Sequence, residues 1–368
     1  MNSKCWIIRF FLLICVQNHL INLITMAKAQ RIALIKQIED HRQSKVLTYI
    51  TSTRQNAEVQ MALDCIRKFY EHLKFITPEE RNNIVIDLLI VSNGGDGTVP
   101  WRLVTLLREY AKEFNVLVPY RAFSAATLTA LGADKIFMHP MGMLGPTDPT
   151  VANAFNPDDP KNPNQKIGIS VEDVTAYIAL IKEDADIRHE DELIQAFKIL
   201  ADKVHPLALG NVKRSLSQSK MMAQKLLSLH MNKGTDQHSI DEISDNLTSK
   251  LYYHGHPINR KEAKQIGLKN IADPDEVLEK LIWDLYVEYE NEIKSDEPFD
   301  PAMEFIANNP ALAAGTTATH EINTKIAFIE CVNRTDYVSI KYAIQGKKLD
   351  NGSHQITANV IERGWKIE

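Results

Sequence analysis

Residues 83–97 read NIVIDLLIVSNGGDG, and this stretch decides the fold. The near-continuous β-branched and aliphatic run over 83–91 is typical of a strand that is buried on both faces of a sheet. A glycine-rich turn, Ser92–Gly97, ends it. Apolar residues then recur every three or four positions from Val99 to Phe114, which predicts an amphipathic helix that starts near Thr98.

The alternation of strand and helix continues on both sides of this unit. Its expected elements are a helix over 27–40, a strand over 45–51, a helix over 58–74, a strand over 115–120, a helix over 125–132 and a strand over 135–139. Segments that alternate at this pitch indicate a parallel sheet wrapped by helices. The sequence therefore predicts an α/β fold.

The second half of the chain has a different pattern. Residues 146–168 contain five prolines and predict a long irregular loop. Helical periodicity runs from Ser170 to about Ser228, with a break near 184–189 and a kink at Pro206, and the polar segment 231–246 is interpreted as a connection. Alternation from residue 318 onward predicts a small antiparallel β unit. We expect a core over 26–272, a helical connection over 273–317 and a β unit over 318–368.

Composition excludes several classes of function. The chain has 368 residues with a net charge of −5, and 24% of its residues are charged. It therefore lacks the bulk basic charge that would hold nucleic acid. The four cysteines, Cys5, Cys15, Cys65 and Cys331, contain no CxxC pair, so neither a disulfide framework nor a structural zinc site is indicated. We expect no cofactor and no metal.

The first 25 residues allow three interpretations. Lys4 and Arg9 precede the apolar run Phe10–Val16, which is too short to cross about 30 Å of hydrocarbon. The segment is a weak signal or signal anchor, an amphipathic surface segment, or a translated stretch upstream of a true start at Met26. We expect a cytoplasmic protein, and membrane association through residues 1–25 stays open.

Two features of the predicted sheet are suited to chemistry. The adjacent glycines Gly94 and Gly95 let backbone amides face a cleft, where they can bind an anion, although a plain strand-to-helix turn uses the same residues. Their spacing does not match a nucleotide-binding motif. Ser124 lies where a strand turns into a helix, so it is either a nucleophile beside unpaired helix amides or an N-cap.

A serine nucleophile needs a neutral base within reach. Lys166 at the end of the proline-rich loop and Lys182 on the following helix are candidates, since burial lowers the pKa of a lysine. Each is equally interpreted as a solvated lysine. His139, His205, His254 and His256 are the histidines expected to be buried, and the pair His254 and His256 is only a weak metal signal.

Residues 124–149, SAATLTALGADKIFMHPMGMLGPTDP, resemble the signature of the serine dehydrogenase proteinase (SDH proteinase) family. This family is related to the signal peptide peptidase A peptidases within the ClpP/crotonase superfamily. The turn Asn93–Gly95 and the segment 251–268, LYYHGHPINRKEAKQIGL, support the resemblance. It covers about residues 45–270.

The resemblance implies a ClpP/crotonase-like spiral of ββα units and a serine peptidase with a Ser–Lys dyad. Ser124 matches the nucleophile, and Gly94, Gly95 and the Ala125 amide match the oxyanion hole. No histidine lies in 144–150, where a ClpP-type triad would place one. Lys166, 166 − 124 = 42 residues after the serine, has the spacing of the related membrane-associated peptidases and is preferred to Lys182 as the base.

The resemblance also implies a peptide or protein substrate and a homo-oligomer. One departure is Ala126, where many relatives have glycine. Two other functions compete with peptide hydrolysis. One is a catalytically silent binding or scaffold protein of the same fold. The other is crotonase-type acyl-CoA chemistry, which the lack of an acidic residue at position 124 disfavours.

Overall fold

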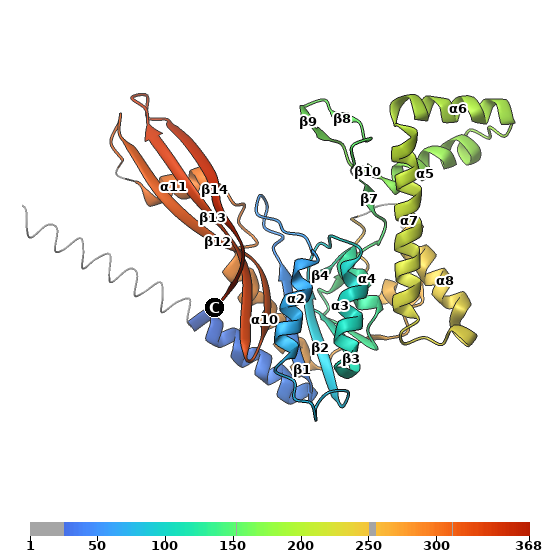
Figure 1. The fold of residues 1–368 in the computed structure, drawn as a ribbon, viewed down its shortest axis with the longest axis horizontal. Helices are drawn as coiled ribbons and strands as arrows, with labels where there is room; N and C mark the ends of the chain where they lie inside the picture. The colour runs from blue at the N-terminus through green and yellow to red at the C-terminus, as the bar shows by residue number, and fades with distance from the viewer. Residues whose placement is uncertain (1–25, 152, 250–254, 311) are drawn as a thin grey trace, which may run out of the picture.

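The structure, a computed structural model, describes residues 26–151, 153–249, 255–310 and 312–368. Its centre is an eight-stranded sheet in the order β11-β5-β3-β2-β1-β12-β13-β14 (Figure 1). Five strands are parallel: β1 (Lys45–Thr51), β2 (Ile84–Val91), β3 (Ala111–Val118), β5 (Lys135–Met138) and β11 (Ile271–Ala272). Three are antiparallel: β12 (Thr317–Cys331), β13 (Arg334–Lys348) and β14 (His354–Ile367).

The prediction of a parallel sheet wrapped by helices is confirmed. On one face lie α2 (Asp64–Leu73), α3 (Val99–Arg108), α4 (Ala125–Leu131), α7 (Pro206–Leu227), α8 (Lys233–Ser249) and α9 (Arg260–Ile266). The helix over 26–42 and α10 (Glu276–Ile293) share a second core with the sheet. Strand β2, whose last six residues are buried, is therefore covered by helices from both sides, as its apolar run requires.

Some predicted boundaries are wrong: the helix expected over 58–74 begins only at Asp64, and the strand expected over 115–120 spans Ala111–Val118. Helix α3 ends at Arg108, and β3 begins at Ala111, whereas the apolar periodicity predicted a helix through Phe114. The ring of Phe114 is fully buried on β3 and packs in the same core as the helix residues. The apolar pattern continues because both elements face one core, so the pattern alone cannot locate the helix end.

The proline-rich segment is more ordered than an irregular loop. Strands β7 (Thr150–Val151) and β10 (Ile169–Ser170) pair at its base, and β8 (Asp158–Asp159) and β9 (Asn162–Lys166) form a hairpin beyond them. This β8–β9 hairpin stands away from the sheet (Figure 1). Backbone pairing of short polar strands leaves little periodicity in the sequence, which explains the missed strands.

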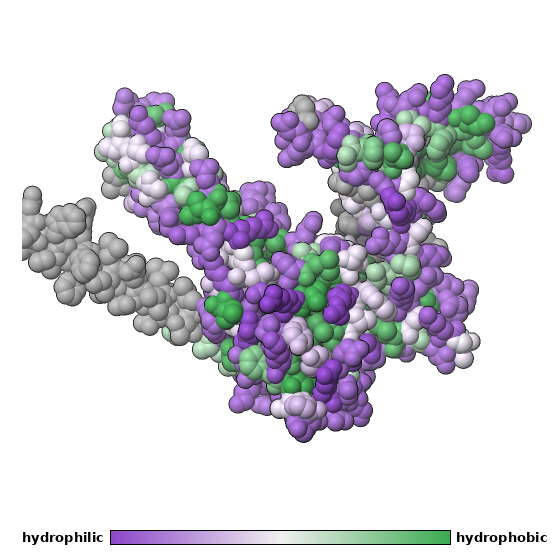
Figure 2. Space-filling model, viewed as in Figure 1, coloured by the Kyte–Doolittle hydropathy of each residue, from purple (hydrophilic) through white to green (hydrophobic). Residues whose placement is uncertain are grey.

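A helical arm follows the hairpin. It consists of α5 (Val171–Ala179), the π-helix η1 (Leu180–Asp184) and α6 (Glu190–Lys203), and α7 returns to the body (Figure 1). The expected break near 184–189 is confirmed. The kink expected at Pro206 is instead a helix boundary, because α6 ends at Lys203 and Pro206 is in the first turn of α7, which His205 caps. The arm carries exposed apolar side chains, among them Ile194, Phe197 and Ile199 (Figure 2).

The segment 231–246 is not a connection, because most of it belongs to helix α8. Ile240, Ile243 and Leu247 are buried and form a single stripe at helical spacing. The rest of the helix is polar, and Ser244 and Thr248 are buried beside this stripe, so its mean composition resembles a loop.

The antiparallel strands after residue 317 agree with the predicted β unit. They extend the main sheet, since β12 pairs with β1 from Thr48↔Glu330 to Thr51↔Ala327. The strands after residue 318, which were expected to form a separate unit, thus belong to the same sheet as the core strands. The division of the chain into units stays a prediction. The far ends of β12–β14 project beyond the body, where α11 (Pro301–Asn308) packs on them (Figure 1).

A buried ion pair joins the helix over 26–42 to this sheet. Arg31 is fully buried, and its Nε donates to Glu330 Oε2 on β12 at 2.9 Å. The Tyr289 hydroxyl of α10 donates to the same carboxylate at 2.5 Å. These bonds satisfy both buried charges, as burial requires.

Residues 1–25, on which the leader interpretations fall, lie outside the described residues. Within the described part of the chain, every helix is too short or too polar to traverse a bilayer.

Candidate active site

Ser124 occupies a strained turn between β4 (Arg121–Ala122) and α4. Its backbone has φ 51° and ψ −115°, a conformation that residues other than glycine adopt rarely. Although Ser124 holds the N-cap position, its hydroxyl makes no capping hydrogen bond. The N-cap interpretation of this serine is therefore not supported, since the hydroxyl does no capping.

The glycine turn after β2 lies directly against Ser124. Gly94 has φ +95°, and a β-carbon there would lie 2.6 Å from the Ser124 β-carbon and 2.7 Å from the Phe123 carbonyl oxygen. Gly95 has φ +151°, and a β-carbon there would overlap the backbone of Met61. Both positions require glycine, for conformation and for close approach.

The amides of the expected oxyanion hole differ in their bonding. The Gly94 amide donates to the Ser92 hydroxyl at 3.0 Å, and that hydroxyl also accepts from Thr51 at 2.7 Å. Among the described residues, the amides of Gly95 and Ala125 make no hydrogen bond. Two of the three expected donors are thus free to bind an oxyanion, and the third supports the turn.

A cavity of about 380 Å³ opens over Ser124 and Gly95, and we call it the Ser124 cavity. Besides the residues of the two turns, it is lined by Gln60, Leu128, Thr147, Pro149, Thr150, Ser215, Gln218 and Ser219. Helix α7 closes one side, and the Ser219 hydroxyl donates to the Thr147 carbonyl. Thr147 and Pro149 belong to the quoted signature, whereas no pattern in the sequence marks Gln60 or the α7 residues.

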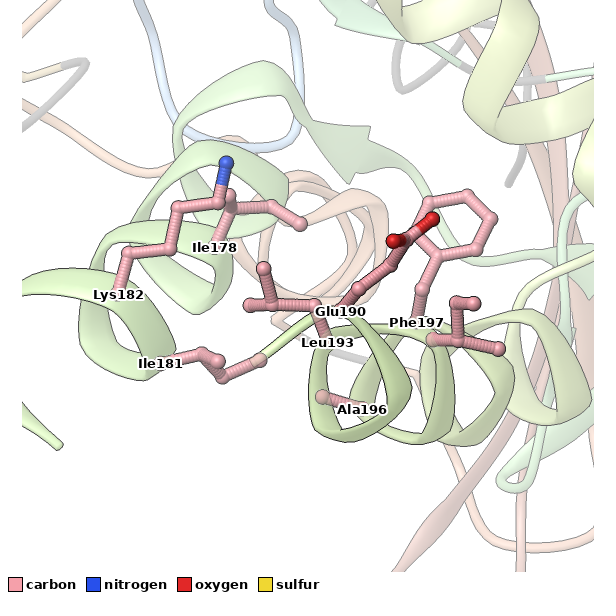
Figure 3. A pocket seen from close by; sticks show the side chains of 8 residues that line it. Ile178, Ile181, Lys182, Glu190, Leu193, Ala196 and Phe197 are labelled. Carbon is pink, nitrogen blue, oxygen red and sulfur yellow. The ribbon is translucent and has the colours of Figure 1, made fainter. Parts of the chain in front are cut away.

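Neither candidate lysine lines the Ser124 cavity. Lys166 lies on the β8–β9 hairpin, where its Nζ is 2.7 Å from Asp158 Oδ1 and its side chain is 39% exposed. Lys182 lies on η1 and faces a separate apolar hollow of about 320 Å³ with Ile178 and α6 residues (Figure 3). The structure brings Ser124 and the glycine turn together and leaves both lysines on segments outside this centre.

The burial expected of four histidines is wrong for the three that the structure describes: His205 is exposed, and His139 and His256 are partly exposed. His139 stacks on Trp283 at 4.8 Å, and burial lowers its pKa. His205 caps α7, and His256 lies 2.6 Å from Glu262 Oε1. His254 is outside the described residues. No group of three His, Cys, Asp or Glu side chains in the described ranges converges as a metal site would need.

A buried Cys–His–Asp chain lies elsewhere, and sequence reasoning missed it. His72 Nδ1 is 3.2 Å from Cys331 Sγ, and His72 Nε2 is 3.1 Å from Asp336 Oδ2. Burial raises the pKa of Cys331 to about 11 and lowers that of His72 to about 4. Thiol and imidazole are therefore neutral at pH 7, and this chain is a structural contact between α2 and the β12–β13 hairpin rather than an activated thiolate.

Among curated proteins, two uncharacterized proteins of Methanocaldococcus jannaschii are similar, one 26% identical over 278 residues (73% of this chain, 81% of the relative) and one 25% identical over 264 residues (68% and 75%).

Solved structures with some likeness include the 1510-N membrane-bound stomatin-specific protease as a serine-to-alanine mutant (15% identity, 65% of this chain, 85% of that chain, TM-score 0.36). A second is its lysine-to-alanine mutant in complex with a substrate peptide (15% identity, 64% of this chain, 78% of that chain, TM-score 0.35). A third is a probable enoyl-CoA hydratase/isomerase from Mycobacterium abscessus (9% identity, 72% of this chain, 84% of that chain, TM-score 0.30). The profile of the ClpP-like SDH-type serine proteinases matches residues 1–223, so the chain belongs to this family and has a ClpP-like α/β fold.

Proposed function

We propose that this protein hydrolyses peptide bonds, with Ser124 as the nucleophile. One observation carries the proposal: the strained Ser124 presents a hydroxyl without a capping bond beside the unpaired amides of Gly95 and Ala125. A serine on a tight strand-to-helix turn projects its oxygen into the cleft, where the helix amides stabilise negative charge. The Ser124 cavity has room for a substrate side chain beside this oxygen.

The reaction follows from these groups. The Ser124 oxygen attacks the peptide carbonyl, and its proton passes to a neutral lysine amine. The amides of Gly95 and Ala125 hold the oxyanion, and the lysine then gives the proton to the leaving amine as the C–N bond breaks. Water attacks the resulting ester by the same route, with its proton going to the lysine, and releases the acid and the serine.

The base is Lys166, with Lys182 as the alternative. Both lie on segments that leave the body, the β8–β9 hairpin and the helical arm (Figure 1). Movement of the proline-rich segment, or a neighbouring copy, has to bring one of them to Ser124 and exclude water from it. A homo-oligomer is consistent with α6, which has no buried residue in the single chain and carries several apolar ones.

Hydrolysis of an unfolded protein by the full chain tests the proposal. We expect Ser124→Ala to reduce the rate on the order of 10³-fold or more. Of Lys166→Ala and Lys182→Ala, only one should reduce it to the same degree. Full activity of Ser124→Ala would contradict the assignment.

The second candidate is a catalytically silent binding protein of the same fold. The observation that favours it is the absence of any lysine or histidine from the described lining of the Ser124 cavity. The folded oligomer of such a protein would bind peptides without cleaving them.

A further inference from the structure

A second cavity, of about 660 Å³, lies between residues 58–64 and strand β14. We call it the β14 cavity; its lining includes Glu58, Gln60, Asp64, Arg363, Gly364 and Trp365. Gln60 also lines the Ser124 cavity, and its side chain is exposed. The two cavities are therefore neighbours that share a wall at one residue.

The position of this wall is fixed by the glycine turn. The Met61 amide donates to the Gly94 carbonyl at 2.8 Å, and the Asp96 amide donates to the Met61 carbonyl at 2.9 Å. Gln60 is therefore held beside the turn that carries the proposed oxyanion donors. A chain bound at Ser124 and directed past Gln60 enters the β14 cavity.

The floor of this cavity is one face of the sheet. Thr51, Ala327, Val338 and Trp365 are cross-strand neighbours on β1, β12, β13 and β14, and all four line it. Gly364 contributes only its backbone, because it pairs with Ser339 and a side chain there would point to the opposite face. Beside it, the Trp365 indole donates to Asp64 Oδ2 at 2.9 Å, which holds an aromatic ring at the cavity wall.

The charges of the two cavities favour a basic occupant. Their described lining contains three carboxylates, Glu58, Asp64 and Asp96, against the single guanidinium of Arg363. None of these four groups takes part in an ion pair with another described residue. The path thus has an excess of two negative charges that the fold leaves uncompensated, and a lysine or arginine of a substrate would pair with them.

We propose that the β14 cavity is a second substrate subsite, which holds an extended basic segment of the polypeptide several residues from the bond cut at Ser124. The inference rests on the proposed peptidase function. It assigns a role to the C-terminal strands, which the catalytic groups do not use: they select for substrates long and basic enough to reach past Gln60.

Binding of fluorescein-labelled peptides to the full-length Ser124→Ala chain, followed by anisotropy, tests this subsite without cleavage. The probes are a lysine-rich and a glutamate-rich unstructured peptide of about ten residues, which reach roughly 33 Å when extended. Glu58→Lys and Arg363→Glu reverse two exposed charges of opposite sign in the lining. Glu242→Lys is the matched control, because Glu242 is also exposed but lies on α8 outside both cavities.

We expect the lysine-rich peptide to bind more tightly than the glutamate-rich one. Glu58→Lys should weaken its binding about tenfold, a change of about 1.4 kcal/mol, and should strengthen binding of the glutamate-rich peptide. Arg363→Glu should have the opposite effect on both peptides, and Glu242→Lys should leave both unchanged. All three changes are at exposed side chains, so the variants should fold.

Equal binding of both peptides, no binding of either, or no effect of Glu58→Lys and Arg363→Glu would overturn the subsite. Reaction of Ser124 with a small fluorophosphonate in the native-serine chain separates this failure from failure of the peptidase function. The small probe needs only the Ser124 cavity, so its reaction reports on the serine whatever the β14 cavity binds. Selective peptide binding without any fluorophosphonate reaction would overturn the substrate role and leave a peptide-binding cavity.

Discussion

A β-carbon on Gly94 would lie 2.6 Å from the β-carbon of Ser124, closer than two such atoms approach in folded proteins. The turn after β2 and the turn before α4 can therefore pack this closely only because Gly94 has no side chain. This contact fixes the position of Ser124 relative to the amides beside it.

Replacement of that glycine should damage both stability and reactivity. Gly94→Ala puts a β-carbon at φ +95°, which costs about 1–3 kcal/mol of unfolding free energy before the clash is counted. Relief of the clash displaces Ser124, so we expect its reaction with an active-site serine probe to slow about tenfold or more. Denaturant unfolding and labelling rates measure the two effects.

Gly97→Ala is the matched control for this change. Gly97 lines the same cavity, but a β-carbon there meets nothing within 4 Å. Its unfolding free energy should stay within about 0.5 kcal/mol of the parent. Equal unfolding free energies and equal labelling rates for Gly94→Ala and Gly97→Ala would show that the close contact of Gly94 with Ser124 affects neither stability nor reactivity.

The sequence was sufficient for the core of the fold because its elements alternate with strong local patterns. Strand β1 occupies the predicted residues 45–51, and β2 and α4 differ by a residue from their predictions. The elements that were missed have weak local patterns. Helix α8 buries only a narrow stripe, and the short strands β7–β10 are stabilised by pairing that periodicity does not reveal.

The buried pair of Arg31 and Glu330 should be costly to break from one side. Arg31→Met leaves Glu330 buried without its guanidinium partner, and we expect a loss of about 3–5 kcal/mol in unfolding free energy. Arg188→Met removes an exposed ion pair with Asp186 and should change stability by less than about 1 kcal/mol. Urea unfolding compares the two, and a small loss in Arg31→Met would contradict the role given to this pair.

Stability should fall with acid because of His72. Burial lowers its pKa to about 4, against the attraction of Asp336 and with a smaller contribution from Arg334. Between about pH 6.5 and 4 the unfolded chain therefore binds the proton that folded His72 excludes, and the unfolding free energy decreases as pH falls through this window. The total is about 3 kcal/mol.

The His72→Gln variant isolates this contribution from those of the other histidines. Its unfolding free energy, measured in urea at intervals from pH 7.5 to 4.5, should decline less steeply than that of the parent. Parallel pH profiles for the two chains would show that His72 does not carry the effect.

The buried thiols should be inert. Burial raises the pKa of Cys65 to about 12 and that of Cys331 to about 11, so almost no thiolate exists at pH 7. In a chain with Cys5→Ser and Cys15→Ser, we expect iodoacetamide to react with the two remaining thiols only after denaturation. Rapid alkylation of the folded chain, with loss of peptide cleavage, would favour a cysteine nucleophile.

The candidate site was predictable in part, for a physical reason. Gly94 and Gly95 follow the end of β2, Ser124 follows the end of β4, and a bridge between Ser92 and Ala122 joins these ends, so local signals there locate them. Gln60 and the α7 residues Ser215 and Ser219 reach the cavity through long-range packing, and nothing near them in the sequence marks this. The position of the base depends on segments that leave the body, so sequence spacing leaves two lysines open.

The role of Ser124 as the nucleophile is tested by labelling the folded full-length chain with a fluorophosphonate and identifying the modified residue by mass spectrometry. We expect a single adduct on Ser124, no adduct in Ser124→Ala, and loss of labelling in one of Lys166→Ala and Lys182→Ala. An unlabelled native chain in a folded, oligomeric sample, or an adduct on another residue, would contradict this role.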